Sequence, residues 1–190
     1  AHPAVRIDPV VAGNHDVVDT SELVDDAPVT TLTSLRVAFT QLAGGLARSV
    51  WICERPQLVP VTDEWSVLAL PYLARAHAER AEPWMSAAFA DATTLRKRGD
   101  RIVVLAHLVV PGATLGSESS EMARGQDQLF PFERVKALAP SLVINGHYHA
   151  RQEVLGEYDV PIQIPGSPVR FTFGEVEDNQ KGFLIASFPP

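Results

Sequence analysis

The sequence predicts a single-domain α/β fold. Short apolar runs rich in Val, Ile and Leu alternate with longer Ala- and Leu-rich stretches, as expected for stacked layers of strands and helices. Three of the apolar runs lead directly into polar segments that contain histidine. The chain has 190 residues, 46% of them hydrophobic, which suffices for one buried core without a disulfide or a structural metal.

Composition also limits the compartment and the partners. The chain has 16 Lys and Arg against 23 Asp and Glu, a formal net charge of −7. Bulk electrostatic binding of nucleic acid depends on many cations, so a nucleic-acid partner requires local contacts or metal ions here. Cys53 is the single cysteine, which excludes an intramolecular disulfide and fits a reducing compartment. Because no apolar stretch reaches the ~20 residues of a membrane helix, we expect a cytoplasmic protein with no membrane span.

The first half of the chain is expected to contain four strands and one helix. The first strand covers residues 7–12 and ends at Gly13. A helix follows, because apolar residues recur at the spacing of a single helical stripe, at Leu32, Leu35, Phe39, Leu42 and Leu46. Three short strands are expected at residues 50–53, 57–60 and 66–70, where Pro and charged residues separate the apolar runs and Pro71 stops the last one.

The second half begins with a helix. Pro83 is predicted to occupy its first turn, since the fixed φ of proline suits that position. The helix should continue to the basic residues 96–98, where Gly99 terminates it. Two further apolar strands are expected at residues 101–106 and 142–145.

Three strand ends carry the residues that suggest chemistry. The first strand leads into Gly13-Asn14-His15-Asp16, the strand at 101–106 leads into His107, and the strand at 142–145 leads into Gly146-His147-Tyr148-His149. In open α/β sheets, ligands bind beyond the carboxyl ends of the strands. We therefore expect these three segments to converge on one crevice.

The residue types in that crevice favour a transition-metal centre. His147 and His149 are two residues apart, so in extended backbone their rings project to the same side and each can serve one ion of a close pair. Imidazole and amide ligands suit manganese, iron or zinc, and a two-metal centre can hold both oxygens of a phosphoryl displacement. An ordinary hydrogen-bonded histidine is the alternative for His107 alone. The combination of motifs favours the metal site.

These motifs resemble those of the calcineurin-like metallophosphoesterases. Within that superfamily, Leu70-Pro71-Tyr72, the run from Pro165 to Glu175 and Lys181-Gly182-Phe183 are similar to the bacterial SbcD-type DNA repair nucleases and their phage counterparts. The resemblance extends from about Val10 to Ile185. It implies a four-layer α/β/β/α sandwich with mixed sheets, in which residues 1–190 form a single nuclease core domain.

The resemblance also implies residue roles. Asn14, His107 and His147 would bind one manganese ion, and His149 would bind the second of two divalent ions. His15 would act on the leaving group, and Asp16 would orient His15 or, equally, cap its own loop. Arg170 and Arg151, and with them Arg124, are the basic residues near the motifs; phosphate contact and a solvated surface role are equally open for each.

One departure from the family concerns its carboxylates. Family members begin with Asp-x-His and Gly-Asp segments that supply aspartate ligands, and neither segment precedes Gly13-Asn14-His15-Asp16 in this chain. Asp8 cannot substitute, because six extended residues at ~3.3 Å each place it at the opposite end of the strand from Asn14. We therefore expect either a core whose N-terminal strands are missing or a degenerate member. We also expect no capping domain.

The functional prediction is a metal-dependent DNA nuclease of the SbcD type, an exonuclease or endonuclease in DNA repair and recombination. DNA, an ABC-type repair ATPase and a second copy of the chain are the partners that the resemblance implies. One alternative is a metallophosphoesterase for small phosphate esters or cyclic nucleotides, and another is a catalytically degenerate scaffold of the same fold. The matches at residues 166–175 and 181–183 favour the nuclease.

Overall fold

The main sheet of this protein has six strands. The computed structural model describes residues 8–13, 16, 22–24, 26–30, 32–33, 50–73, 77–115, 128–155, 160–169 and 181–186. In these residues the chain is mixed α/β, with the sheet order β5-β6-β7-β8-β10-β9. The strands are β5 (Gln57–Pro60), β6 (Trp65–Leu70), β7 (Arg101–Ala106), β8 (Leu142–Asn145), β10 (Ile162–Ile164) and β9 (Gln152–Val154).

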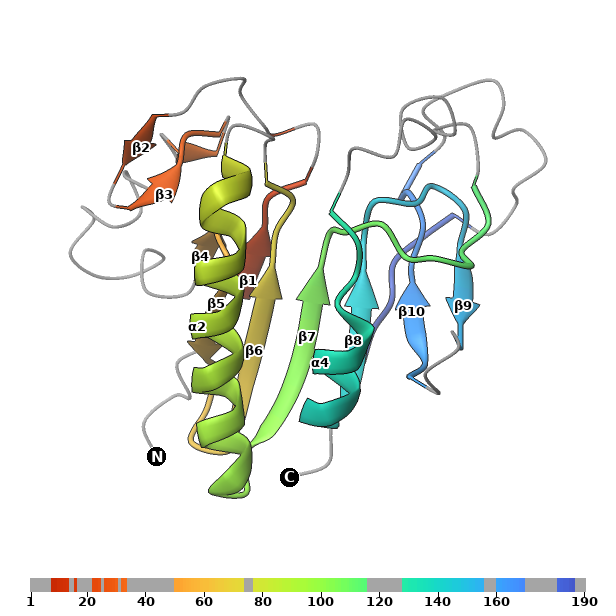
Figure 1. The fold of residues 1–190 in the computed structure, drawn as a ribbon. Coiled ribbons are helices and arrows are strands. Elements are labelled where there is room, and N and C mark those ends of the chain that lie inside the picture. The colour runs from red at the N-terminus through yellow and green to blue at the C-terminus, as the bar shows by residue number, and fades with distance from the viewer. Residues whose placement is uncertain are drawn as a thin grey trace.

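The centre of the sheet is parallel and its edges are antiparallel. β6, β7, β8 and β10 run in one direction, whereas β5 pairs antiparallel with β6 and β9 with β10. Helix α2 (Ala78–Lys97) connects β6 to β7, and α4 (Phe132–Leu138) lies between β7 and β8 in the chain. Both helices lie on the same face of the sheet, and the carboxyl ends of β6, β7 and β8 meet at the top edge in Figure 1. Parallel strands joined by a helix produce this common edge.

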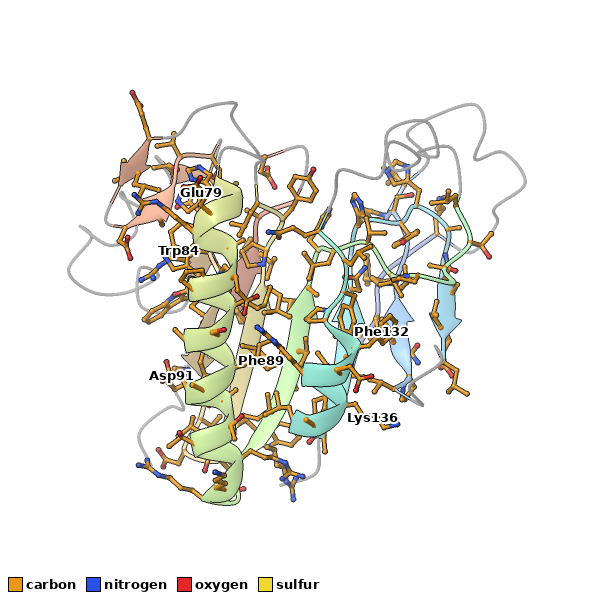
Figure 2. The ribbon with its side chains drawn as sticks, viewed as in Figure 1. Glu79, Trp84, Phe89, Asp91, Phe132 and Lys136 are labelled. Carbon is orange, nitrogen blue, oxygen red and sulfur yellow. The ribbon has the colours of Figure 1, made fainter. Side chains whose placement is uncertain are left out.

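The larger core lies between the two helices and the sheet. β6 and β7 place alternate side chains in it, as a strand with one face against helices must. On the helical side, Figure 2 shows Phe89 on the side of α2 that faces α4 and Asp91 on the opposite side. The fully buried strand residues of this core include Leu68, Leu70, Ile102, Val104, Ile162 and Ile164.

A second, two-stranded parallel sheet packs against β5 and β6 on the other face of the main sheet. It consists of β1 (Asp8–Val11) and β4 (Val50–Cys53). Cys53 packs with Val59 of β5 and Ala69 of β6, whose side chains point away from the helical core because their neighbours Leu58 and Leu68 point into it. The described residues thus form three layers, in the order helices, six-stranded sheet and small sheet (Figure 1). A short hairpin, β2 (Leu23–Val24) and β3 (Ala27–Pro28), flanks them.

Most of the predicted strands are confirmed. The strands at 50–53, 57–60, 101–106 and 142–145 have the predicted ends, the strand at 66–70 begins one residue earlier, and the first strand is observed at Asp8–Val11. The predicted helix at residues 32–46 lies outside the described residues except for Leu32 and Thr33. Helix α4 was not anticipated. In the described ranges, no helix combines the length and the apolar character needed to cross a bilayer.

The predicted start of the second helix is wrong. Helix α2 begins at Ala78, so that Pro83 lies inside it rather than in its first turn. A proline there lacks the N–H that would bond the carbonyl of Glu79, which costs about 3 kcal/mol. The five residues before it, Ala-Glu-Arg-Ala-Glu, are all strong helix formers, and this favours a helix through the proline. The predicted end is confirmed, because α2 stops at Lys97 and Gly99 has φ 100°.

Candidate functional site

The carboxyl ends of five strands are joined by backbone hydrogen bonds into one edge. This edge continues the ladders beyond the last residues of β1, β4, β6, β7 and β8. The bonds run from Ala12 N to Cys53 O (3.1 Å), from Tyr72 N to Ala12 O (3.0 Å), from His107 N to Leu70 O (2.9 Å) and from Gly146 N to Ala106 O (2.8 Å). The expected convergence of the three strand ends therefore occurs.

The imidazole of His107 lies between two glycines from different strands. A Cβ atom built on Gly13 would be 2.7 Å from Cε1 of His107, and one built on Gly146 would be 2.7 Å from its Nδ1. Real Cβ atoms do not approach other atoms this closely, so both positions require glycine as long as the ring stays in place. The two glycines of the sequence motifs thus provide space for the histidine of the third segment.

His147 lies next to His107. The centroids of the two rings are 5.1 Å apart, and the ring of Tyr72 is 5.9 Å from that of His147. Two imidazoles that bind one ion at about 2.1 Å have ring centres roughly 5 Å apart at ordinary ligand angles, and the observed separation equals this value. His147 is buried and His107 is half-buried.

The backbone at His147 corrects one step of the sequence argument. His147 has φ 76°, in the left-handed region that L-residues occupy at a cost. The prediction that His147 and His149 share a side assumed extended backbone, and this assumption is wrong because His147 turns the chain. Strain of this kind is concentrated at functional sites, where the surrounding structure maintains it.

His149 is held through its backbone carbonyl. That oxygen accepts hydrogen bonds from Nζ of Lys181 (2.9 Å) and from the backbone N–H of Ser167 (3.1 Å). Lys181 Nζ also donates to Oγ of Ser167 at 2.7 Å. Gly166, with φ 77°, lies so close that an added Cβ would be 2.8 Å from the same carbonyl oxygen. Gly166, Ser167 and Lys181 therefore contact the histidine motif.

Asp16 acts as a loop cap in this structure. Its Oδ2 accepts a hydrogen bond from the Gly13 N–H at 2.9 Å, and its own N–H bonds the Gly13 carbonyl at 3.1 Å. This closes a turn between Gly13 and Asp16 at the end of β1.

The other predicted site residues are only partly described. Asn14, His15 and Arg170 lie outside the described residues, whereas Arg151 is exposed beside the histidine motif. Asp8 begins β1 at its amino end, as expected.

The remaining metal ligands are not assembled in the described part of the chain. No group of three or more His, Cys, Asp or Glu side chains in those ranges could hold a metal ion. His107 and His147 lie side by side, and the Asp16 carboxylate is engaged by the backbone of its own turn. In the described ranges the predicted ligands are therefore represented by this histidine pair and by His149.

The sequence argument missed two polar residues of this region. Asn145 is fully buried at the end of β8, and Tyr148 is 3% exposed. The signal for Asn145 was an amide at the last position of an otherwise apolar strand, where a buried polar group requires specific partners.

Comparison with protein-family models finds no matching family, and comparison with curated proteins finds no matching relative. The functional proposal below is therefore based on residues and geometry.

Proposed function

We propose that this chain is the core of a metal-dependent DNA nuclease of the SbcD type, which hydrolyses phosphodiester bonds. The observation that carries this proposal is the position of His107, whose ring lies between Gly13 and Gly146 with the ring of His147 5.1 Å away. Three motifs that are far apart in the sequence meet there at the carboxyl edge of a sheet, where α/β proteins place their ligands.

The proposed fold is the four-layer sandwich of that family. The three layers of the described residues support it, because the helices and the β1–β4 sheet pack against opposite faces of the main sheet, the latter at β5 and β6. The fourth layer is assigned to the helix predicted from the apolar stripe at residues 32–46.

The proposed roles follow the motifs. His107 and His147, with Asn14, would hold one divalent manganese ion, and His149 would hold a second. When bound, the ions would lower the pKa of a water molecule and stabilise negative charge on the phosphate oxygens. His15 would donate a proton to the leaving oxygen. Asp16 accepts a hydrogen bond from the Gly13 N–H and so caps the loop that carries His15 in the sequence. Arg151, exposed next to the histidine motif, is available to a DNA phosphate.

Contacts at His149 favour a nuclease over an esterase for small substrates. Ser167 and Lys181 belong to the two segments that resemble SbcD-type nucleases, and both donate to the His149 carbonyl oxygen. These segments are therefore part of the site's framework. DNA is accordingly the proposed substrate, and a repair ATPase and a second copy of the chain are the proposed protein partners.

The test is a cleavage assay with manganese(II), run on the chain as printed and on the longest natural reading frame that contains it. Linear duplex DNA and a chromogenic phosphodiester are compared as substrates. We expect the chain as printed to cleave DNA poorly, because it lacks the aspartate ligands, and the longer protein to cleave it well. His107→Ala and His147→Ala should abolish cleavage by the longer protein, while Lys136→Ala on the outside of α4 leaves it unchanged. Turnover of the small ester without DNA degradation would contradict the nuclease proposal, and inactivity of both proteins on both substrates would favour the scaffold.

A second experiment separates His15 from the metal ligands. In the active protein, His15→Ala should lower activity by about 10²–10⁴-fold, the usual contribution of a positioned acid or base, and should retain bound manganese. His147→Ala should lower metal content instead, so that its activity depends on manganese concentration. Metal analysis alongside DNA cleavage distinguishes the two. If excess manganese restores His15→Ala, the proton-transfer role is wrong.

A further inference from the structure

A set of side-chain hydrogen bonds extends the β7–β8 pairing beyond the ends of both strands. We call it the amide–hydroxyl clamp; it consists of Asn145, Tyr148 and Gln152, each bonded to both backbone polar groups of one residue in the segment 108–114. The backbone ladder itself ends at the pair Ala106 and Asn145. The clamp bonds are Asn145 to Leu108 (3.0 and 3.0 Å), Tyr148 to Val110 (2.8 and 3.0 Å) and Gln152 to Thr114 (2.7 and 2.9 Å).

Asn145 joins the backbones of the two histidines. Its Oδ1 accepts a hydrogen bond from the Leu108 N–H, which belongs to the peptide that follows His107. Its Nδ2 donates to the Gly146 carbonyl at 2.7 Å, which belongs to the peptide that precedes His147. One buried amide therefore bonds a peptide group next to each histidine. The second of these peptide groups directly precedes His147, whose φ is 76°.

Tyr148 reinforces the same arrangement one step further along the chain. Its hydroxyl accepts from the Val110 N–H and donates to the Val110 carbonyl, so both backbone groups of that residue are satisfied by one oxygen atom. Between them, Val109 bonds in the other direction, to Gln128 and Phe130. The segment after His107 is thus fixed on both sides, and among the described residues its bonds to the side of the histidine motif come from side chains.

We propose that Asn145 and Tyr148 are positioning residues for the His107–His147 pair. They hold the backbone of one histidine against that of the other and so set the ring separation at which a divalent ion would bind. This inference rests on the proposed metal-dependent function. Removal of either side chain leaves buried backbone groups without their partners, and the two segments are then free to separate.

The test compares Asn145→Leu and Tyr148→Phe with Gln152→Met, which removes an equivalent pair of bonds at the exposed end of the clamp. Val135→Ala, a truncation of a fully buried side chain in α4, controls for loss of stability alone. Two properties of the full chain are measured. The first is the nuclear Overhauser effect between the imidazole protons of His107 and His147 without metal, and the second is manganese(II) affinity by calorimetry.

We expect Asn145→Leu to abolish the ring–ring Overhauser effect and to weaken manganese binding by about 10–100-fold, the range seen when partners of metal ligands are lost. Tyr148→Phe should change both properties in the same direction, while Gln152→Met and Val135→Ala keep both near the wild-type values. If Asn145→Leu fails to fold, the same two properties are measured on Asn145→Asp, which retains the acceptor for Leu108, and on Tyr148→Phe. These two variants then decide whether the positioning role holds.

The two proposals can fail separately. A folded Asn145 variant that retains the Overhauser effect overturns the positioning role, and so does an equal loss of metal affinity in Gln152→Met. If the wild-type chain binds no manganese but the Overhauser effect still disappears selectively in the two clamp variants, the positioning role stands and the metal function is wrong.

Discussion

The ring of His107 lies against the backbone of Gly146, so closely that a Cβ on that glycine would be 2.7 Å from Nδ1 of the ring. The two residues are also linked through the sheet, because the Gly146 N–H bonds the carbonyl of Ala106 at 2.8 Å. A side chain at residue 146 and the observed position of the imidazole therefore exclude each other. The contact predicts the effect of substitution directly.

Gly146→Ala should destabilise the protein by about 1–3 kcal/mol, the usual cost of overpacking a filled site. Gly146 has no positive φ, so an alanine meets only the ring and no backbone strain. The matched control is the same substitution in the His107→Ala background, where the penalty should disappear. Urea unfolding of the four proteins gives this double-mutant cycle. Equal costs in both backgrounds would show that the ring is not the obstacle.

The left-handed backbone at His147 predicts an unusual order of stabilities. At φ 76°, His147→Gly should be more stable than His147→Ala by about 1 kcal/mol, because glycine occupies this region without the cost that a Cβ imposes. His149 has no positive φ, so there the order should reverse and alanine should be the more stable. Chemical denaturation of the four variants measures both differences. The same order at both positions would contradict the observed turn.

Lys181 should stabilise the histidine motif through Ser167 and the His149 carbonyl. Lys181→Met removes two donated hydrogen bonds and is expected to cost about 1–2 kcal/mol, since bonds from charged donors exceed neutral ones. Ser167→Ala should cost less, because its backbone N–H still bonds His149. The double variant should lose less than the sum of the two, as expected for a shared network, and additive losses in thermal unfolding would disprove the network.

The buried thiol predicts a pH dependence of stability. Burial, and then the neighbouring Glu54 carboxylate, raise the pKa of Cys53 from its ordinary value of 9.0 to about 12. Above pH 9 the unfolded chain loses this proton while the folded chain keeps it, so stability should fall as pH rises to 12, by up to about 1.4 kcal/mol per pH unit. Below pH 9 the contribution is fully present.

Cys53→Ala provides the control for this dependence. Lysines and tyrosines titrate in the same pH range, so the difference between the wild-type and Cys53→Ala slopes isolates the thiol. The native thiol should also react slowly with a disulfide reagent at pH 8 and rapidly after unfolding, because the reactive species is the thiolate. Identical slopes together with rapid native labelling would show that Cys53 is accessible.

The sequence by itself determined the strands and their common edge. Strands β7 and β8 were predicted to the residue because a short apolar run that ends at polar residues is a local signal in the sequence. The meeting of Gly13, His107 and the Gly146 segment followed from one rule, that parallel strands end on the same side. Neither required knowledge of contacts between distant residues.

Tertiary structure alone decided the details of the site. Asn145 and Leu108 are 37 residues apart, and nothing in the sequence near either one predicts their pairing. The same holds for the left-handed turn at His147, which follows the Gly146 carbonyl that Asn145 bonds, and for Gly13, which faces an imidazole from another strand. Local pattern sets which elements form, whereas hydrogen bonds and close contacts between separated elements set where each imidazole lies.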